Sequence, residues 1–207
     1  MKAAWEPHSK MSGYLIAFEG LDQSGKQTQA EALRDHVTGQ ERPCELLSFP
    51  DYGTPIGSEI ARALHGDRHY EPDVMQLLYV TNRYEKREQI ARWLHAGTVV
   101  LCDRYLASSV AYGETHGLDP GWLTDIQRFL PAPALTILLD IAPETAVQRK
   151  AAGRDRYERD LALLARVRAS YRRQAEVPGW LRIDGERPKD QVSMDIIHAV
   201  STRLGQP

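Results

Sequence analysis

A glycine-rich loop that ends in a lysine is the part of the sequence best suited to chemistry. Residues 20–26 read G-L-D-Q-S-G-K and follow the apolar run 14–19. Because glycine lets the backbone fold closely around a polyanion, the amide groups of such a loop can surround phosphates. The next helix adds the positive end of its dipole, and Lys26 adds a mobile charge for the outer phosphates. The motif predicts a phosphate-binding loop, the alternative being a tight turn that binds nothing.

The residue after this lysine departs from the motif. A Ser or Thr is usual there, because its hydroxyl binds magnesium, but this chain has Gln27 and places Thr28 one position later. Magnesium keeps several waters and needs few protein ligands, so the missing hydroxyl does not rule out a metal held mainly by nucleotide phosphates and waters. Whether Thr28 replaces the missing hydroxyl is left open. The residues expected to bind the donor nucleotide are Gly20, Gln23, Ser24, Gly25, Lys26, Gln27 and Thr28.

Composition and charge favour one soluble domain. The chain has 207 residues, of which 42% are hydrophobic and 26% charged, and a net charge of -2. This balance gives no sign of a nucleic-acid or membrane partner, so any anion site must be a local cluster. Two cysteines without metal-ligand spacing suit a reducing, cytoplasmic compartment. No apolar stretch reaches a membrane span. We expect residues 1–13 to be a loose extension and residues 14–207 to form a single domain.

The apolar pattern indicates strands that alternate with helices. Five short apolar runs cover residues 14–19, 45–49, 98–103, 135–141 and 180–184. Several are continuous, which is typical of parallel strands buried on both faces. Helical patterns separate the runs, and prolines at 72, 120, 143 and 188 favour helix starts. We predict an α/β fold with a five-stranded parallel sheet flanked by helices.

Chemically active residues follow the predicted strands. Phe49 and Pro50 follow the second strand, and Asp103 and Arg104 end the third. Because parallel strands end at one edge of the sheet, where ligands bind in such folds, these residues are expected to converge with the loop. Asp140 ends the fourth strand. Capping of the next helix is at least as good an explanation of Asp140 as a magnesium role.

Six stretches of the sequence together resemble thymidylate kinase, a nucleoside-monophosphate kinase with the P-loop NTPase fold. They are FEGLDQSGK, FPDYGTPIG, LLYVTNRYEKREQI, DRYLASSVAY, LLDIAPETAVQRK and GRDRYE. They lie between residues 18 and 158, and we take the resemblance to extend from residue 15 to about residue 190. The combination of a P-loop with DRY-x-x-S-x-x-A-Y is highly specific. The resemblance implies the reaction ATP + dTMP → ADP + dTDP, with Mg²⁺ as cofactor, ATP as donor and a cytoplasmic homodimer.

The residue types agree with phosphoryl transfer. A phosphate monoester is largely dianionic near neutral pH, because its second pKa is about 6, so it is a nucleophile without a general base. The candidate sites accordingly hold arginines and carboxylates, and the seven histidines are scattered. The task is then to bring two polyanions into line and to neutralise charge as the group moves. Arginine suits this because its fork binds phosphate bidentately and keeps its charge.

The resemblance also implies residue roles. Asp22 would hold the sugar 3′-hydroxyl near the acceptor phosphate, and Arg104 would hold that phosphate, with Asp103 beside the metal. Tyr79 would stack on thymine, and Arg83 would donate to a thymine carbonyl. Further residues of the acceptor site would be Phe49 and Pro50 in the wall, Ser108 and Ser109 at the polar edge of the base, and Tyr112, which would exclude ribonucleotides.

Two of these roles have simpler alternatives in the residue pattern alone. Tyr79 lies at helical spacing from Met75 and fits a core position. Arg83 belongs to the charged run 83–88, which is typical of a solvated helix face. Arg104 is different, because an arginine at a strand's carboxyl end in this fold points to function.

A basic cluster around Gly153 resembles the mobile lid of these kinases, at about residues 149–158. Such a lid closes over ATP and brings arginines to the moving phosphoryl group, whereas the alternative is a basic surface loop. Some thymidylate kinases have a catalytic arginine inside the P-loop, but here residues 21–24 are Leu, Asp, Gln and Ser. We therefore expect Arg154 first, and then Arg149 and Arg156, to join Lys26, Asp22 and Arg104 in catalysis.

The chain departs from the family pattern at three positions. Besides Gln27, Asp51 stands where an arginine is common, and Gly113 stands where a larger polar residue is frequent. Asp51 removes a positive charge expected near the acceptor phosphate. Two other functions therefore remain open, a kinase for another pyrimidine deoxynucleotide such as dUMP and a non-catalytic nucleotide-binding protein.

Overall fold

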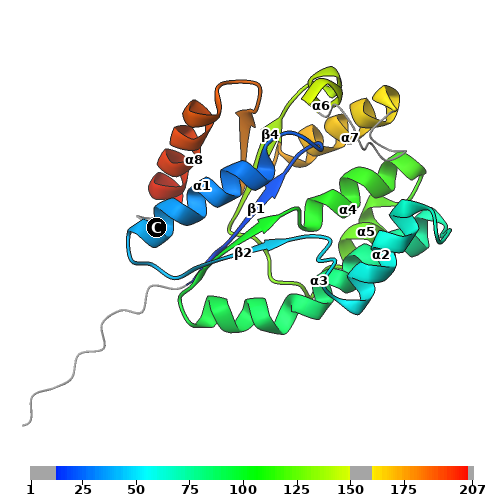
Figure 1. Ribbon diagram of the computed structural model, residues 1–207, viewed down its shortest axis with the longest axis horizontal. Coiled ribbons are helices and arrows are strands. Elements are labelled where there is room, and N and C mark those ends of the chain that lie inside the picture. Colours follow the sequence, from blue (N-terminus) through cyan, green and yellow to red (C-terminus); the bar gives the residue numbers. More distant parts are fainter. Residues whose placement is uncertain (1–12, 150–159, 205–207) are drawn as a thin grey trace, which may run out of the picture.

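The computed structural model describes residues 13–149 and 160–204 and contains a five-stranded, entirely parallel sheet (Figure 1). The strand order is β2-β3-β1-β4-β5. The strands are β1 (Leu15–Glu19), β2 (Cys44–Ser48), β3 (Val99–Asp103), β4 (Leu135–Asp140) and β5 (Trp180–Asp184). All five apolar runs form strands, with bounds that differ from the prediction by at most one residue. The predicted α/β fold is confirmed.

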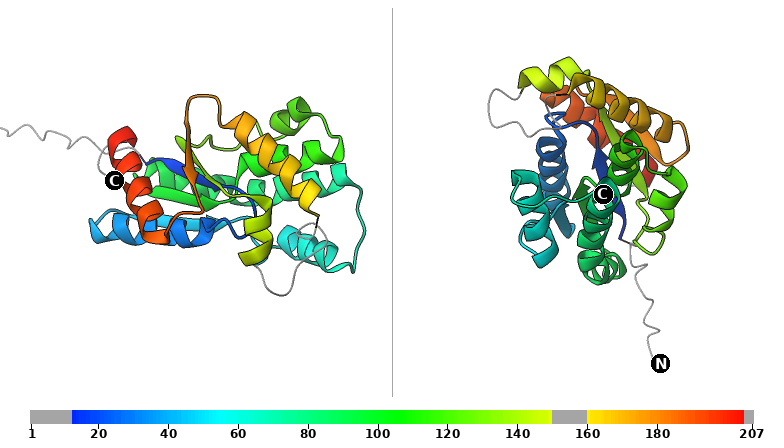
Figure 2. Two further views of the ribbon diagram at one scale, coloured as in Figure 1. Left: turned by 90° about the horizontal axis from the view of Figure 1, so that it is seen from above. Right: turned by 90° about the vertical axis from the view of Figure 1, so that its right-hand side faces the viewer.

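Helices connect the strands and cover both faces of the sheet (Figure 2). They are α1 (Lys26–Gly39), α2 (Pro55–His65), α3 (Pro72–His95), α4 (Leu106–Gly113), the short 3-10 helix η1 (Glu114–His116), α5 (Pro120–Asp125), α6 (Pro143–Arg149), α7 (Leu161–Gln174) and α8 (Lys189–Leu204). Local chemistry sets several starts. The side chains of Thr54, Asp119 and Asp160 accept amide hydrogen bonds at the starts of α2, α5 and α7.

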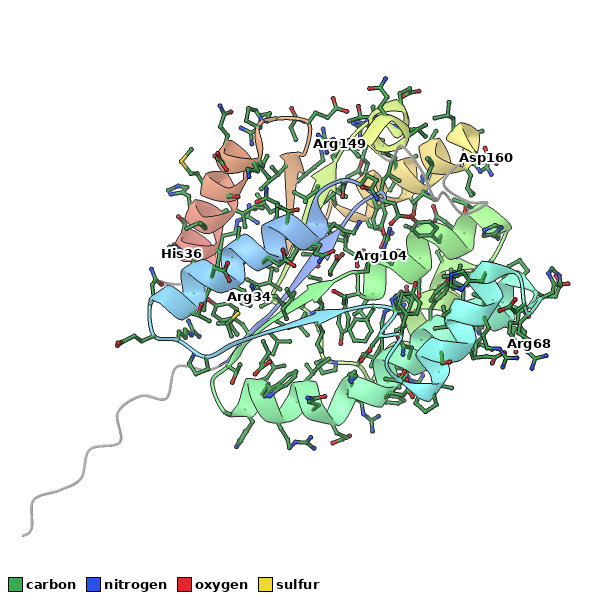
Figure 3. The ribbon with its side chains drawn as sticks, viewed as in Figure 1. Arg34, His36, Arg68, Arg104, Arg149 and Asp160 are labelled. Atoms are coloured by element: carbon green, nitrogen blue, oxygen red, sulfur yellow. The ribbon has the colours of Figure 1, made fainter. Side chains whose placement is uncertain are left out.

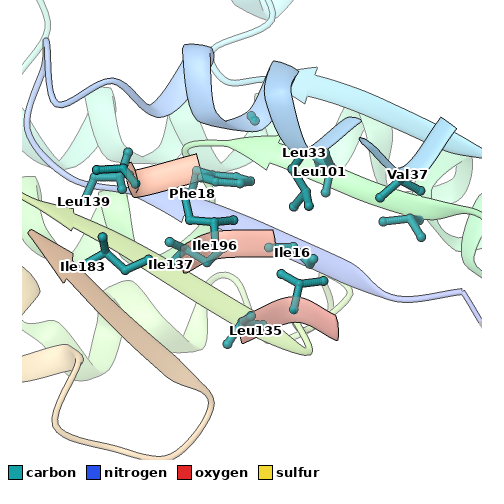
Figure 4. Close-up of a cluster of buried hydrophobic side chains, with 14 residues drawn as sticks. Ile16, Phe18, Leu33, Val37, Leu101, Leu135, Ile137, Leu139, Ile183 and Ile196 are labelled. Atoms are coloured by element: carbon teal, nitrogen blue, oxygen red, sulfur yellow. The ribbon is translucent and has the colours of Figure 1, made fainter. Parts of the chain in front are cut away.

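The central strand is buried from both sides, which explains its continuous apolar run. Ile16 and Phe18 face α1 and α8 and contact a core that includes Leu33 and Ile196 (Figure 4). Leu15 and Ala17 face the opposite core, with residues of α3. Because successive strand residues point to opposite faces, a strand covered twice has no solvent-facing position.

The parallel arrangement brings the strand ends to one edge, as predicted. The Arg104 amide donates to the Phe18 carbonyl at 2.9 Å, and the Phe49 amide donates to the Asp103 carbonyl at 2.9 Å. These bonds tie the residues that follow β2 and β3 to the end of β1, where the glycine-rich loop starts. No helix within residues 13–149 and 160–204 has the length and apolar character needed to cross a membrane.

Candidate functional site

The guanidinium group of Arg104 lies at the centre of this sheet edge (Figure 3). Its Nη2 lies 2.6 Å from Asp22 Oδ1 and donates to the Tyr112 hydroxyl at 3.2 Å. Its Nη1 donates to the hydroxyls of Ser108 at 3.2 Å and Tyr171 at 3.3 Å. Burial acts to lower the pKa of Arg104, but Asp22 and the two tyrosines outweigh it and raise that pKa well above its ordinary value. The arginine is therefore a permanent cation beside the loop.

The glycine-rich loop has the backbone that the motif predicts. Gly20 has a φ of 141°, and a Cβ atom there would lie 2.5 Å from the Leu139 carbonyl oxygen, so only glycine fits. Lys26 Nζ donates to the carbonyl groups of Leu21 at 2.9 Å and Gly20 at 3.3 Å. The hydroxyl of Ser24 is buried without a partner within the described residues. The loop thus holds polar groups available to a ligand.

Burial of Lys26 has an electrostatic consequence. Its side chain is desolvated and faces the nearby positive charge of Arg104, and these effects lower its pKa to about 8. The carboxylates of Asp22 and Asp103 act in the opposite direction but are outweighed. An anion placed between the two cations would reverse this balance, because it favours the charged lysine.

Arg149, the last residue of α6, also contacts the glycine-rich loop. Its Nη1 donates to the Gln23 carbonyl at 3.2 Å, and its Nη2 donates to the Gly185 carbonyl at 3.0 Å. Arg149 thus joins the loop to the segment after β5. Of the predicted lid, 149–158, only this residue is described, and Arg154 and Arg156 lie outside the described residues.

A cavity of about 570 Å³ opens beside Arg104, within the size range of small-ligand sites. Asp22 and Arg104 line one part of it, and Arg83 lines another. Every residue predicted for the acceptor site lines this cavity, namely Asp22, Phe49, Pro50, Tyr79, Arg83, Arg104, Ser108, Ser109 and Tyr112. The structure therefore brings the whole predicted set together, from four separate parts of the chain.

Arg83 is buried in the cavity wall, so the interpretation as part of a solvated face is wrong. Its side chain is 3% exposed, and its Nη1 donates to Ser109 Oγ at 2.7 Å and Gln127 Oε1 at 3.2 Å. Burial lowers its pKa. The Nε atom is buried without a partner within the described residues. A cation with neutral partners and an unpartnered donor suits a ligand with carbonyl oxygens.

The segment after β2 forms a tight turn that a second helix anchors. The Asp51 carboxylate lies 2.7 Å from Lys86 Nζ, and this bond together with the Gly53 amide lowers the pKa of Asp51 despite partial burial. The Asp51 amide donates to Asn82 Oδ1 at 2.7 Å. Gly57 is required here, because a Cβ atom would lie 1.8 Å from the Asp51 carbonyl oxygen. Asp51 thus fixes the turn that presents Phe49.

A magnesium ion would find one carboxylate oxygen available. Asp103 Oδ1 is buried without a partner within the described residues, at the end of β3. Residues 13–149 and 160–204 contain no group of three or more metal-ligating side chains. This donor set fits an ion that phosphates and waters hold for the most part. Gln27 and Thr28 are both exposed at the start of α1, and Gln27 Nε2 donates to Glu31 at 3.0 Å.

The predictions for Asp140 were wrong. Its carboxylate accepts hydrogen bonds from Arg168 at 2.6 Å and Arg172 at 2.9 Å, so both oxygens are occupied. At the start of α6 it is Glu186 that accepts a hydrogen bond from a backbone amide, that of Ala142, at 2.7 Å. Asp140 therefore anchors α7 to the sheet, and it neither caps a helix nor leaves an oxygen for magnesium.

Comparison with known proteins assigns the fold and site to one family. The family model described as thymidylate kinase matches residues 18–196. The chain belongs to the thymidylate kinase family. It is 35% identical to the thymidylate kinase of Dictyostelium discoideum over 185 residues, covering 89% of this chain and 83% of that protein. It is also 35% identical to the probable thymidylate kinase of Pyrococcus abyssi, covering 94% and 98% of the two chains.

A solved structure agrees with the sequence comparison. The thymidylate kinase of Candida albicans superposes with a TM-score of 0.81 at 29% identity, covering 95% of this chain and 94% of that one. The P-loop NTPase fold and the resemblance inferred from the six motifs are both confirmed. The roles of individual residues stay predictions.

Sequence reasoning about this thymidylate kinase family member missed the residues that support the site. Tyr171 accepts a hydrogen bond from Arg104, Glu19 accepts one from the amide of the next residue, Tyr105, and Gln127 accepts one from Arg83. Glu19 directly precedes the glycine-rich loop, and this position was the available signal. Tyr171 and Gln127 carried none, because their partners Glu19, Arg104 and Arg83 lie 44 to 152 residues away in the sequence.

Proposed function

We propose that this enzyme transfers the γ-phosphoryl group of ATP to dTMP and produces dTDP and ADP. The observation that carries the proposal is the arginine-lined cavity that opens beside the glycine-rich loop. Arg104 and Asp22, which form an ion pair, stand between the two. An acceptor phosphate bound at Arg104 would lie next to a donor triphosphate in the loop. Family membership supports the same reaction.

The chain's own residues supply positioning and charge. Arg104 would hold the dTMP phosphate with its fork, and Lys26 would leave the loop carbonyls to contact the outer phosphates of ATP. The acceptor phosphate is itself the nucleophile, so no residue needs to remove a proton. The cavity lining does include His69 and His116, both of which are exposed, and the proposed reaction assigns a proton transfer to neither. Arg154, outside the described residues, would stabilise the charge of the transition state.

The polarity of the cavity supports thymine as the base. Arg83 has an unpartnered Nε donor, and a donor suits a carbonyl oxygen such as O4 of thymine rather than the amino group of cytosine. Tyr79 lines the same cavity and presents an aromatic surface to the base. Tyr112 lies close to both Arg104 and Asp22, where it would restrict the sugar's 2′ position.

We further propose that Mg²⁺ is required and that the enzyme is a cytoplasmic homodimer. Asp103 would bind the ion, which neutralises phosphate charge in such reactions. For the dimer, helix α3 exposes Val74 at 37% and Leu77 at 43%, which suits contact with a second copy. Light scattering after size exclusion tests the assembly, and a monomeric mass would contradict it.

A coupled assay tests the reaction directly. Purified protein is supplied with ATP and with dTMP, dUMP or dCMP, each with and without magnesium. We expect dTMP to be the best acceptor and turnover to require the metal. A better rate with dUMP would replace the acceptor, and ATP binding without any turnover would favour a non-catalytic protein.

A further inference from the structure

A buried carboxylate contacts three of the residues that surround Arg104. Glu19, the last residue of β1, is 0% exposed. Its Oε1 accepts from the Tyr105 amide at 2.8 Å, and its Oε2 accepts from the hydroxyls of Ser108 at 2.7 Å and Tyr171 at 3.1 Å. These three donors come from the end of β3, from α4 and from α7. Such a buried charge is tolerated only when its hydrogen bonds are satisfied, as they are here.

The carboxylate sets the direction of the hydrogen bonds around it. A carboxylate can only accept, so Glu19 draws the protons of both the Ser108 and Tyr171 hydroxyls, which also lie 2.9 Å from each other. Their oxygen lone pairs are then free to accept from Arg104 Nη1, which lies at 3.2 Å and 3.3 Å. Burial raises the pKa of the Tyr171 phenol well above its ordinary value, so it keeps its proton at neutral pH. Glu19 thus holds the Nη1 side of the guanidinium group through two hydroxyls, while Asp22 and Tyr112 contact the Nη2 side.

Glu19 also holds the backbone at the same point. Arg104 has a φ of 63°, in the left-handed region that residues other than glycine adopt at a cost. The amide of the next residue, Tyr105, donates to Glu19 and so fixes the chain after this turn. The backbone and the side chain of Arg104 therefore both depend on the carboxylate.

We propose that Glu19 and Tyr171 are positioning residues that fix Arg104 for the acceptor phosphate. Neither residue lines the cavity, so both act through the arginine. Tyr171 also makes the acceptor site dependent on α7, the helix that follows the predicted lid and is anchored to β4 by Asp140. The proposal rests on the proposed role of Arg104 in binding the dTMP phosphate.

The decisive variant is Tyr171→Phe, and the chain provides a matched control. Tyr105 is also a fully buried tyrosine next to Arg104, but its hydroxyl has no partner within the described residues. Tyr105→Phe therefore also removes a buried phenol oxygen, but it breaks no hydrogen bond within the described residues. With the full-length enzyme, Tyr171→Phe should raise the KM for dTMP about tenfold, because it removes a hydrogen bond to a charged group. The KM for ATP should stay within about twofold, and Tyr105→Phe should change neither constant.

A second variant tests the direction in which the Ser108 and Tyr171 hydroxyls donate their hydrogen bonds. Glu19→Gln keeps the shape but adds a donor, so the hydroxyls can turn round and point their protons at Arg104. We expect a larger rise in the KM for dTMP than Tyr171→Phe produces. The melting temperature of each variant shows whether it is folded. If Glu19→Gln does not fold, Tyr171→Phe and its control still decide the question.

The outcomes separate this inference from the proposed function. If the wild-type enzyme does not phosphorylate dTMP, the proposed function fails first. If it does, and Tyr171→Phe lowers only the melting temperature while the KM for dTMP is unchanged, the tyrosine is merely structural and the inference is overturned. An equal rise in the KM values for ATP and dTMP would overturn it as well.

Discussion

Arg104 Nη2 lies 2.6 Å from Asp22 Oδ1, and this ion pair joins the acceptor side of the site to the phosphate-binding loop. Asp22 belongs to the loop that follows β1, and Arg104 to the turn that follows β3. Their strands are neighbours in the sheet, with Phe18 opposite Asp103 in the register. An acceptor that contacts both residues would therefore be placed by the sheet itself against a donor triphosphate bound in the loop. Positioning of this kind is the main part of catalysis in phosphoryl transfer.

Arg104→Ala should weaken the acceptor site selectively. The KM for dTMP should rise by at least about 100-fold, because a bidentate, charge-assisted contact is lost. The KM for ATP should change little, since we assign Arg104 only to the acceptor phosphate. Steady-state kinetics with each substrate varied in turn measure both constants. Arg87→Ala is the control. Arg87 lies on α3, the helix that carries Arg83, but it pairs with Glu88 at the surface. Equal loss of both affinities would count against the assignment.

Arg154→Ala and Arg149→Ala should affect different constants. Arg154 is assigned to the transition state, so its loss should lower kcat on the order of 10³-fold with small effects on ground-state binding. Arg149 instead bonds to the Gln23 and Gly185 carbonyls, so its loss should mainly raise the KM for ATP. Arg34→Ala, on the distant part of α1 in Figure 3, is the control. An unchanged kcat in Arg154→Ala would move the role to Arg149 or Arg156.

Gln27→Thr should lower the magnesium concentration needed for half-maximal activity. The replacement restores the hydroxyl that the P-loop motif places after the lysine, where it binds the metal. Thr28→Ala is the matched test of the neighbouring hydroxyl, which α1 turns by about 100° from that position. Magnesium titrations at saturating ATP and dTMP measure the effect. If Thr28→Ala raises the magnesium requirement and Gln27→Thr changes nothing, Thr28 is the residue that replaces the missing ligand.

The sequence predicted the elements well because their signals are local. A run such as 135–141 shows its burial in its own composition, and the loop at 20–26 carries its φ requirements in its glycines. Polar partners were not predictable in this way. Asp140 was interpreted from its position at the end of a strand, whereas its partners Arg168 and Arg172 lie on α7, 28 and 32 residues away. Arg83 shows the same limit, since a charged run does not reveal which member turns inward.

The positions of Glu19 and Tyr171 next to the Arg104 site were not predicted, for a related reason. Glu19 and Tyr171 are separated by 152 residues and meet only when α7 packs on the sheet. Tyr171 lies on the apolar stripe of α7, so its position predicts core packing and hides its hydroxyl. The family resemblance supplied the acceptor residues, which periodicity alone had left ambiguous at Tyr79 and Arg83.

The pH dependence of ATP use should report Lys26. Its pKa in the free enzyme is lowered to about 8, so the side chain loses its charge above that pH. The kcat/KM for ATP should therefore fall above pH 8 by up to about tenfold per pH unit, because the uncharged amine must be protonated before it holds phosphate. The kcat should fall only at higher pH, since bound phosphates raise the pKa of the lysine.

Unfolding driven by Lys26 cannot explain a fall in kcat/KM above pH 8, because the titration of this lysine makes the folded state more stable as the pH rises. The pKa of Lys26 is below its ordinary value of 10.5 in the folded protein, so the unfolded chain binds more protons between pH 8 and 10.5. This group alone therefore makes stability rise with pH across that window. Melting temperatures from pH 7 to 9.5 provide the control, and Lys26→Met should have a low kcat/KM without this alkaline decline. A wild-type kcat/KM for ATP that stays flat to pH 9.5 would contradict the role of Lys26.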